Sequence, residues 1–273
     1  MTTLEKINLL IVGLSSFYTK ASVPNDVADH NQIIPSECLK SQDYLTTIKE
    51  WTENQKMVLN VKKTKVMVFN FTDKHQFSTR LNLNDESLEI VKYAKLLGVI
   101  VSDNLKWDEN TTYLVKRANS RMELLRKVAS FGTSIEEKKN IYILYIRSIL
   151  EQSCVVWHSS LTAENAQELE RIQKAAVRII LGKNFENYEE ALDRIDLQPL
   201  NVKREELCLK FAKKSLQNPK VRDIFPKREK SHEMLLRDEE KFVVKHANTE
   251  RMKKSPIPYM QGLLNADYKK TVE

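Results

Sequence analysis

Apolar residues recur along the chain first with helical spacing, then with the spacing of strands, and then with helical spacing again. The first helical pattern begins after Ser41, which is a suitable N-cap, and ends at Asn60. The residues expected on its apolar face lie three or four positions apart and are Leu45, Ile48, Trp51 and Tyr44. Before this helix, residues 1–20 read as a strand or short buried segment followed by a turn, and residues 21–40 read as a polar loop.

Several segments between residues 63 and 101 have the composition of β-strands. Residues 63–71 are rich in Val and Phe on both faces, which predicts a strand that is covered on both sides. A polar turn at residues 84–87 separates two shorter apolar runs. Residues 94–101 are expected to form one further strand, and Gly98 inside it indicates a bulge or a close backbone approach.

The spacing after Asp103 is helical. A first stripe, followed by Gly132 as a stop and Ser134 as the next N-cap, consists of Leu114, Ala118, Met122, Leu125, Val128 and Ala129. The next helix, over residues 135–156, is apolar on most sides and is expected to be a central, buried element. Thr162 begins a third helix that Gly182 closes, with a stripe of Leu169, Ile172, Ala176, Ile179 and Ile180.

Shorter helical patterns follow at residues 188–195 and 202–216, and weak ones lie near residues 233–246 and 258–264. We therefore predict an α+β chain that is predominantly α. Its expected parts are residues 1–103 with a small β-sheet, residues 104–217 as a helical bundle, and residues 218–273 as a basic helical extension. The aromatic residues expected in cores, rather than as platforms for stacking bases, are Trp107, Trp157, Tyr142 and Tyr145.

The charge of the chain is concentrated at its C-terminal end. The net charge of the whole chain is +7. Residues 1–200 hold 26 basic and 26 acidic residues, whereas residues 201–273 hold 18 basic and 11 acidic residues. An excess of positive charge attracts polyanions such as nucleic acid, and a solvated tail would show the same excess. Charge alone does not separate these two interpretations.

The cysteine content and the hydropathy of the chain indicate its cellular compartment. The three cysteines, Cys38, Cys154 and Cys208, are far apart, fit neither a disulfide framework nor a zinc site, and are expected to be buried thiols in a reducing environment. The longest apolar run, residues 9–14, is too short for a membrane span and lacks the basic flank of a signal peptide. We expect an intracellular protein, cytoplasmic or nuclear, with no disulfides and no membrane partner.

A series of motifs follows a fixed order along the chain. They are WTENQKMVLN with KTKVMVF (residues 51–69), KLLGV (95–99), IYILYIRSILEQSCVVWHSSLT (141–162), LERIQKAAVRIILG (169–182), YEEAL (188–192), LQPL (197–200), KREELCLKFAKK (203–214) and IPYMQGLLN (257–265). This series resembles the reverse transcriptase of jockey-type non-LTR retrotransposons. Each motif is moderately specific, and their number, order and spacing make the set specific. The resemblance implies the end of a polymerase palm over residues 1–103, a helical thumb over 104–217 and a basic extension.

The resemblance also implies where the chemistry of that family would lie. Its polymerases hold two Mg²⁺ ions with an aspartate pair in a Tyr-x-Asp-Asp hairpin and one earlier aspartate. The segment that follows the pair resembles the first residues here, so the pair is expected just before Met1, and no Asp-Asp dipeptide occurs in the sequence. Asp26 and Asp29 do not lie in the motif. We therefore expect an inactive, truncated RNA-directed DNA polymerase without a cofactor of its own.

The remaining candidate residues would contact a primer–template or non-specific nucleic acid. Lys63 or Lys65 lies near the position of the family's palm lysine, and Leu97 and Gly98 would carry the primer grip, where backbone approaches phosphate. The basic residues expected along the first thumb helix, beside the duplex backbone, are Lys116, Arg117, Arg121, Arg126 and Lys127. Solvent-exposed lysines, a strand bulge at Gly98 and a solvated helix face are the structural alternatives.

Other classes of protein find less support. No HExxH, H-x-D, glycine-rich phosphate loop or G-x-S-x-G motif occurs. Residues 114–131 weakly resemble the helical N-terminal domain of AlkB-type dioxygenases, but without the iron-binding set that activity is not implied. The main alternative is a non-catalytic helical interaction protein that was co-opted from a retroelement. A truncated polymerase would instead expose an apolar surface at residues 7–14, through which it could associate.

Overall fold

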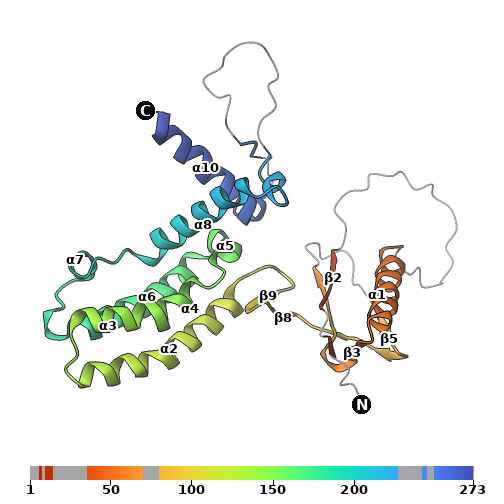
Figure 1. The fold of residues 1–273 in the computed structure, drawn as a ribbon, viewed down its shortest axis with the longest axis horizontal. Helices are drawn as coiled ribbons and strands as arrows, with labels where there is room; N and C mark the ends of the chain where they lie inside the picture. The colour runs from red at the N-terminus through yellow and green to blue at the C-terminus, as the bar shows by residue number, and fades with distance from the viewer. Residues whose placement is uncertain are drawn as a thin grey trace, which may run out of the picture. The chain divides into compact units, whose positions relative to one another are not determined.

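The computed structural model describes residues 6–7, 10–14, 36–69, 80–226, 242–244 and 249–272, and their side chains from residue 41 onward except at residues 269, 271 and 272. The chain forms two compact units, Met1–Glu109 and Asn110–Glu273, and the ribbon of each can be followed in Figure 1. Most described residues are helical and a few short strands are present, so the predicted class, α+β and predominantly α, is confirmed. The predicted division into three parts at residues 103 and 217 stays a prediction.

The first unit contains a small parallel sheet. The strands β2 (Leu10–Leu14), β4 (Lys65–Phe69) and β7 (Glu89–Ile90) lie in the order β2-β4-β7. Val66, Met67 and Phe69 of the central strand are all buried, as expected for a parallel strand covered on both faces. The strand begins two residues later than predicted, because the residues before it form the 3-10 turn η1 (Val61–Lys63), and its predicted last two residues lie outside the described ranges. Lys63 therefore lies in a turn and not in the strand.

Helix α1 (Ser36–Asn54) covers this sheet, and it differs from the prediction at its start and on its faces. It begins five residues before Ser41 and ends at Asn54 rather than at Asn60. Leu45 is 1% exposed, whereas Trp51 is 55% exposed. Leu45 and Thr52 are seven residues apart and so share one face, and Trp51 is turned about 100° away from that face. Thr52 is accordingly buried in place of the tryptophan.

The core of the first unit joins residues from the helix, the sheet and the segments between them. Its buried members are Leu45, Leu59, Val66, Leu81, Leu83 and Leu88. The remaining strands are short pairs: β1 (Lys6–Ile7) with β3 (Val58–Leu59), β5 (Asn82–Leu83) with β6 (Glu86–Ser87), and β8 (Tyr93–Leu96) with β9 (Val99–Ser102). The predicted turn at residues 84–87 is present as the two-residue turn Asn84-Asp85, in which both residues have positive φ.

The second unit is helical. Its elements are α2 (Asp108–Ser130), α3 (Ile135–Ile141), the π-helical segment η2 (Tyr142–Arg147), α4 (Ser148–Glu151), α5 (Cys154–Trp157), η3 (His158–Ser160), α6 (Ala163–Leu181), η4 (Gly182–Asn184), α7 (Tyr188–Arg194), α8 (Leu200–Gln217), η5 (Arg222–Ile224), α9 (Glu250–Lys253) and α10 (Pro256–Val272). α2 crosses the unit boundary by two residues. No helix in the described ranges is long and apolar enough to cross a membrane.

Local signals set the ends of the first helices correctly. The stripe of α2 is buried at Leu114, Ala118, Met122 and Leu125, as predicted. Gly132, with a φ of 73°, follows the helix. Ser134 then caps α3 through a capping box in which its side chain accepts from the backbone of Glu137 and the Glu137 carboxylate accepts from the backbone of Ser134.

The single buried helix predicted at residues 135–156 is wrong in two respects. The helical path runs from α3 through η2 to α4, and then breaks at Ser153, which has a φ of 53°. It is also buried on one side only, because Leu144 is 66% exposed and Tyr145 is 50% exposed. Tyr145 is thus not a core residue, whereas the other three aromatic residues predicted in cores, Trp107, Tyr142 and Trp157, are buried.

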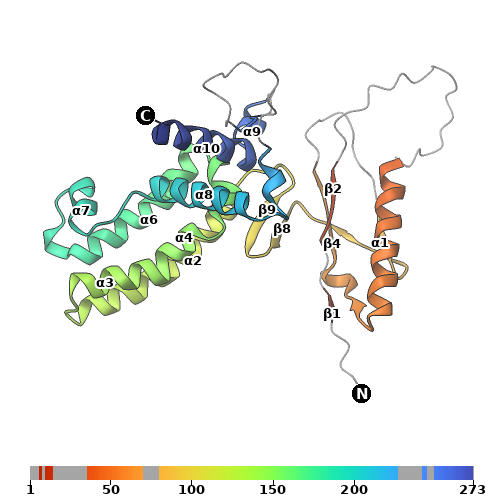
Figure 2. The ribbon, with the colours of Figure 1, turned by 45° about the horizontal axis from the view of Figure 1, so that its top comes forward.

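The last helices pack on each other. Thr162 caps α6 by accepting from the backbone of Asn165, as predicted. Figure 2 shows α10 beside α8, and the two share a core of Cys208, Ala212, Phe225, Met260 and Leu264. The helix expected at residues 258–264 is longer than predicted, and that expected at residues 233–246 falls almost wholly outside the described residues. The side chains of residues 7–14 also lie outside them, so an apolar surface there stays a prediction.

Candidate functional site

Leu97 and Gly98 form the turn of a hairpin and do not lie within a strand. β8 and β9 are antiparallel, with Leu96 opposite Val99, and the two residues between them have φ values of 48° and 88°. Two positive φ values in a two-residue loop are typical of the turn that matches the twist of a hairpin. The single strand predicted over residues 94–101 is therefore wrong, because a short turn with strand-forming residues on both sides carries little signal except its glycine.

The tip of this hairpin is unusually apolar and open. Leu97 is 93% exposed although leucine neither favours a left-handed backbone nor gains from contact with water. Tyr93 and Leu96 are 58% and 44% exposed on the same strand. The hairpin tip therefore presents several apolar side chains to solvent, and clustered exposed apolar side chains are often contact points.

The two candidate lysines of the first unit differ in their surroundings. Lys63 ends the η1 turn and is exposed, and its backbone N–H donates to the Asn60 side chain. Lys65 is only partly exposed and pairs with Glu89, which is its neighbour in the register of β4 and β7. The positive charge of Lys65 is thus matched by a carboxylate, and Lys63 is the better placed of the two to meet a phosphate.

Four of the five basic candidates on α2 face solvent, and the fifth, Arg117, does not. Lys116, Arg121 and Lys127 are exposed and form no ion pair with other described residues. Arg126 Nη1 lies 3.0 Å from Glu123 Oε2 on the surface, and such exposed pairs are weak.

Arg117, by contrast, turns toward its own unit. Its Nη1 donates to Gln152 Oε1 at 2.6 Å, and its guanidinium lies 5.3 Å from the centre of the Tyr113 ring. Arg117 therefore holds the break before α5 in place rather than facing solvent. Lys116 and Lys127 are eleven residues apart, close to three full turns, and so share one face of α2.

A buried polar network that the sequence did not reveal joins the helices of the second unit. The Tyr142 hydroxyl donates to Gln173 Oε1 at 2.6 Å, and Gln173 Nε2 donates to the Tyr188 hydroxyl at 2.9 Å and to the Gln198 carbonyl at 3.0 Å. The Tyr188 hydroxyl in turn donates to Glu170. Burial raises the pKa of both tyrosines, so they act as neutral donors. Gln173 lies next to the apolar stripe of α6. A polar side chain at such a position was the one sequence feature that could have indicated this network.

Arg204 is the second buried polar feature. It is fully buried in α8, and its Nε donates to His158 Nδ1 at 3.3 Å while its guanidinium lies 5.6 Å from the centre of the Trp157 ring. Burial and, to a smaller extent, the nearby charge of Arg204 together lower the pKa of His158 to about 4. His158 is therefore neutral at neutral pH, and its Nδ1 is occupied as an acceptor.

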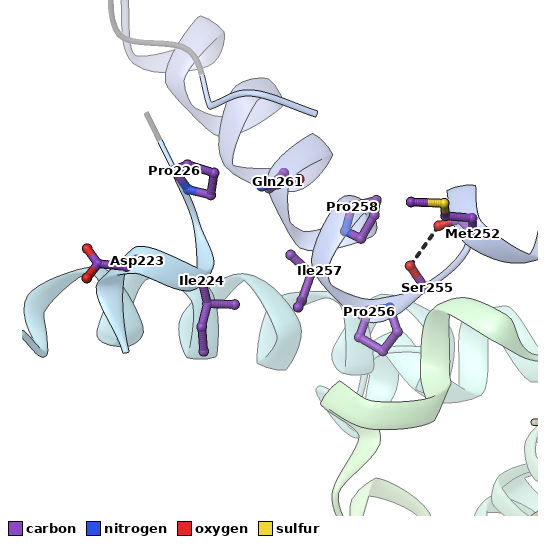
Figure 3. Close-up of a pocket in the computed structure, with 9 residues that line it drawn as sticks. All are labelled: Asp223, Ile224, Pro226, Met252, Ser255, Pro256, Ile257, Pro258 and Gln261. Atoms are coloured by element: carbon purple, nitrogen blue, oxygen red, sulfur yellow. Dashed lines mark hydrogen bonds between the residues drawn. The ribbon is translucent and has the colours of Figure 1, made fainter. Parts of the chain in front are cut away.

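A hollow of about 440 Å³ lies between η5 and the start of α10. Figure 3 shows the apolar side chains of Ile224, Ile257 and Pro258 around it, and the Ser255 hydroxyl donating to the carbonyl of Met252 at 2.7 Å. The Asp223 side chain at its edge is 91% exposed. The wall of this hollow is mostly apolar, which is typical of a contact surface.

Metal-binding chemistry finds no support in the described part of the chain. Over those ranges, no three His, Cys, Asp or Glu side chains are grouped so that they could hold a metal ion. Cys154 and Cys208 are free thiols and buried, as predicted for structural cysteines.

Comparisons with family models, with curated proteins and with solved structures gave no match.

Proposed function

We propose that this chain is the rear part of a non-LTR retrotransposon reverse transcriptase, and that it binds nucleic acid without adding nucleotides by itself. The ordered motifs from residue 51 to residue 265 support the family. The protein would then bind a primer–template, or nucleic acid of any sequence, through phosphate contacts.

The observation that best supports nucleic-acid binding is that helix α2 is buried on one side and exposes basic residues on the other. One side is buried along Leu114, Met122 and Leu125, and the opposite side exposes Lys116 and Lys127. These lysines are separated by about 16 Å along the helix axis, given a rise of about 1.5 Å per residue. A rigid helix that carries two unpaired cations on one face can lie along a duplex backbone and contact several phosphates.

Fluorescence anisotropy with a labelled RNA–DNA hybrid at low salt tests this proposal. The double variant Lys116→Gln/Lys127→Gln should bind severalfold more weakly, with no change in thermal stability, because both side chains are exposed. The matched control is Lys183→Gln/Lys210→Gln, which removes the same charge from exposed positions of the same unit. Equal loss in both double variants would show a general charge effect, and no loss in either would count against a role for α2.

The absence of polymerase activity is a separate part of the proposal. Two-metal transfer of a nucleotide requires carboxylates that hold both ions, and no Asp-Asp dipeptide occurs in the sequence. Purified protein should therefore incorporate no labelled nucleotide on a primed RNA with Mg²⁺ present. Incorporation above that of a heat-denatured sample would refute this part while leaving nucleic-acid binding intact.

A non-catalytic interaction protein is the second candidate, and the exposed apolar side chains favour it. Leu97, Phe131 and Leu144 are 93%, 82% and 66% exposed, and exposed apolar groups of this size are often contact points. A co-opted interaction protein should be monodisperse and should unfold cooperatively. Its binding to nucleic acid should be absent even at low salt, which is the outcome that separates it from the first candidate.

A further inference from the structure

A second hollow lies at the end of α8, and it combines an exposed aromatic ring with a lysine. It has a volume of about 670 Å³, and it lies between the last turns of α8 and the segment that leads into η5. Phe211 and Lys214 both line it. The side chain of Phe211 is 46% exposed, although an aromatic side chain gains free energy when it is buried. The hollow therefore offers an open ring face to a partner.

Hydrogen bonds within the segment after α8 fix the far wall of this hollow. The Asn218 carbonyl accepts from the backbone N–H groups of Val221 and Arg222 at 3.1 and 2.9 Å. The Asn218 side chain accepts from the backbone N–H of Lys220 at 3.0 Å. Phe225, where the segment ends, is buried in the core that α8 shares with α10. Since these backbone donors are already engaged, the wall must recognise a partner through side chains and not through backbone pairing.

The segment around the hollow is strongly basic. Residues 207–222 contain five basic residues and no acidic residue. Lys213 is matched by Asp267 of α10, with 2.7 Å between Nζ and Oδ2. Arg222 meets its neighbour Asp223 at the exposed surface, where such pairs are weak. Most of the positive charge is therefore available to a partner, and the partner that complements it is an anion.

Three side chains at the wall match the parts of one nucleotide in a single strand. Phe211, Lys214 and Gln217 follow each other at three-residue spacing on one side of α8, and all three line the hollow. A base of any kind can stack on the phenylalanine ring, and the lysine can contact a phosphate. The glutamine amide can both donate to the edge of a base and accept from it. An acidic peptide would supply the charge, but the backbone donors that it would need are engaged.

We propose that this hollow binds single-stranded nucleic acid, with an unpaired base against Phe211 and a phosphate at Lys214. The inference rests on the proposed function, because both treat the chain as a nucleic-acid-binding protein. It names a different ligand and a different surface, however, since α2 would contact the backbone of a duplex. The bases of a fully paired hybrid are stacked on each other, so a hybrid offers no free ring face to Phe211.

Fluorescence anisotropy of the full chain with labelled oligo-uridine and oligo-thymidine of about ten nucleotides tests the proposal at low salt. Phe211→Ala should weaken binding about fivefold or more, because a stacked base is lost. Phe211→Trp should keep the affinity and add tryptophan fluorescence that the strand quenches. The matched control is Tyr145→Ala, which removes another half-exposed aromatic ring from the same unit. Dependence on Phe211 with either strand supports the proposal, and the tighter strand identifies the ligand as RNA or DNA.

A charge variant and two competitors complete the test. Lys214→Gln should reduce the slope of log affinity against log salt by about 0.7, the value for one phosphate contact with a single strand. Equal affinity of the natural chain and Phe211→Ala, an equal loss in Tyr145→Ala, or full displacement of the strand by polyglutamate or by a fully paired hybrid would overturn the proposal. If the same preparations still bind the hybrid through α2, only the single-strand site fails. No binding of hybrid or strand at low salt would refute the proposed function as well.

Discussion

Acidification should destabilise the helical unit through His158, and the contacts of this residue allow the effect to be worked out. Arg204 from α8 donates to its Nδ1, and Tyr259 from α10 packs edge-on at 5.9 Å between ring centres. Protonation would put a second positive charge beside the guanidinium and would remove the acceptor of its Nε–H. His158 therefore binds a proton more weakly in the folded chain than in the unfolded chain.

The size and sign follow from the two pKa values. The pKa of His158 is 6.5 in an ordinary setting and about 4 in the folded chain. The unfolded state binds more protons between these values, so stability falls as the pH is lowered from about 6.5 to 4. At pH 5 the resulting loss in the free energy of unfolding, relative to neutral pH, would be about 2 kcal/mol if the shift acted in full. Because His158 is only half-buried, we expect about 1 kcal/mol.

Urea unfolding at pH 7.5, 6 and 5, followed by circular dichroism, measures this effect when the natural chain is compared with His158→Gln. Glutamine does not titrate, and its carbonyl can still accept from Arg204. The comparison cancels every titration that the two proteins share. Glu137, Glu206 and Glu250, whose pKa values are lowered from 4.5, stay ionised in this range, and their contribution to stability is lost only at lower pH. The difference between the two proteins should change by about 1 kcal/mol from pH 7.5 to 5. A difference that stays constant over this range would refute the reasoning.

Three further predictions concern stability. Leu125→Ala removes a side chain that is 0% exposed in α2 and should lower the free energy of urea unfolding by about 2–5 kcal/mol, whereas the exposed Leu124→Ala should change it by less than about 0.5 kcal/mol. Ser134→Ala breaks the capping box of α3 and should cost about 1 kcal/mol, with Ser134→Asp close to the natural stability. Gly98→Val forces a β-branched residue to the positive φ of the hairpin turn. It should raise hydrogen exchange of the β9 amides, and unchanged exchange would show that this turn tolerates the substitution.

The accuracy of the sequence-based predictions follows the range of the interactions that decide each feature. The stripe of α2, the stop at Gly132 and the cap at Ser134 depend on residues within one or two turns, and all three were predicted correctly. The start of α1 was not predicted correctly, because the helix begins at Ser36, five residues before the expected N-cap Ser41. Trp51 was placed on the apolar face because it lies three residues after Ile48, although the helical angle from Leu45 favours Thr52, which is buried.

The candidate site shows the same limit. The exposed lysines of α2 could be read from the face opposite its apolar stripe. The orientation of Arg117 toward Gln152 could not be predicted from the sequence, because that contact joins residues 35 positions apart. The hydrogen-bond network around Gln173 likewise depends on how η2, α6 and α7 pack. No local pattern in the sequence contains that information.

The salt dependence of hybrid binding tests the central proposal most directly. Each phosphate contact made by a lysine releases counterions and contributes about −0.9 to the slope of log affinity against log salt for a duplex. The natural chain should show a steep negative slope, and Lys116→Gln/Lys127→Gln should reduce its size by about 2, while Lys183→Gln/Lys210→Gln should leave it nearly unchanged. The same slope in all three proteins, or no binding at low salt, would contradict the proposal that α2 binds nucleic acid.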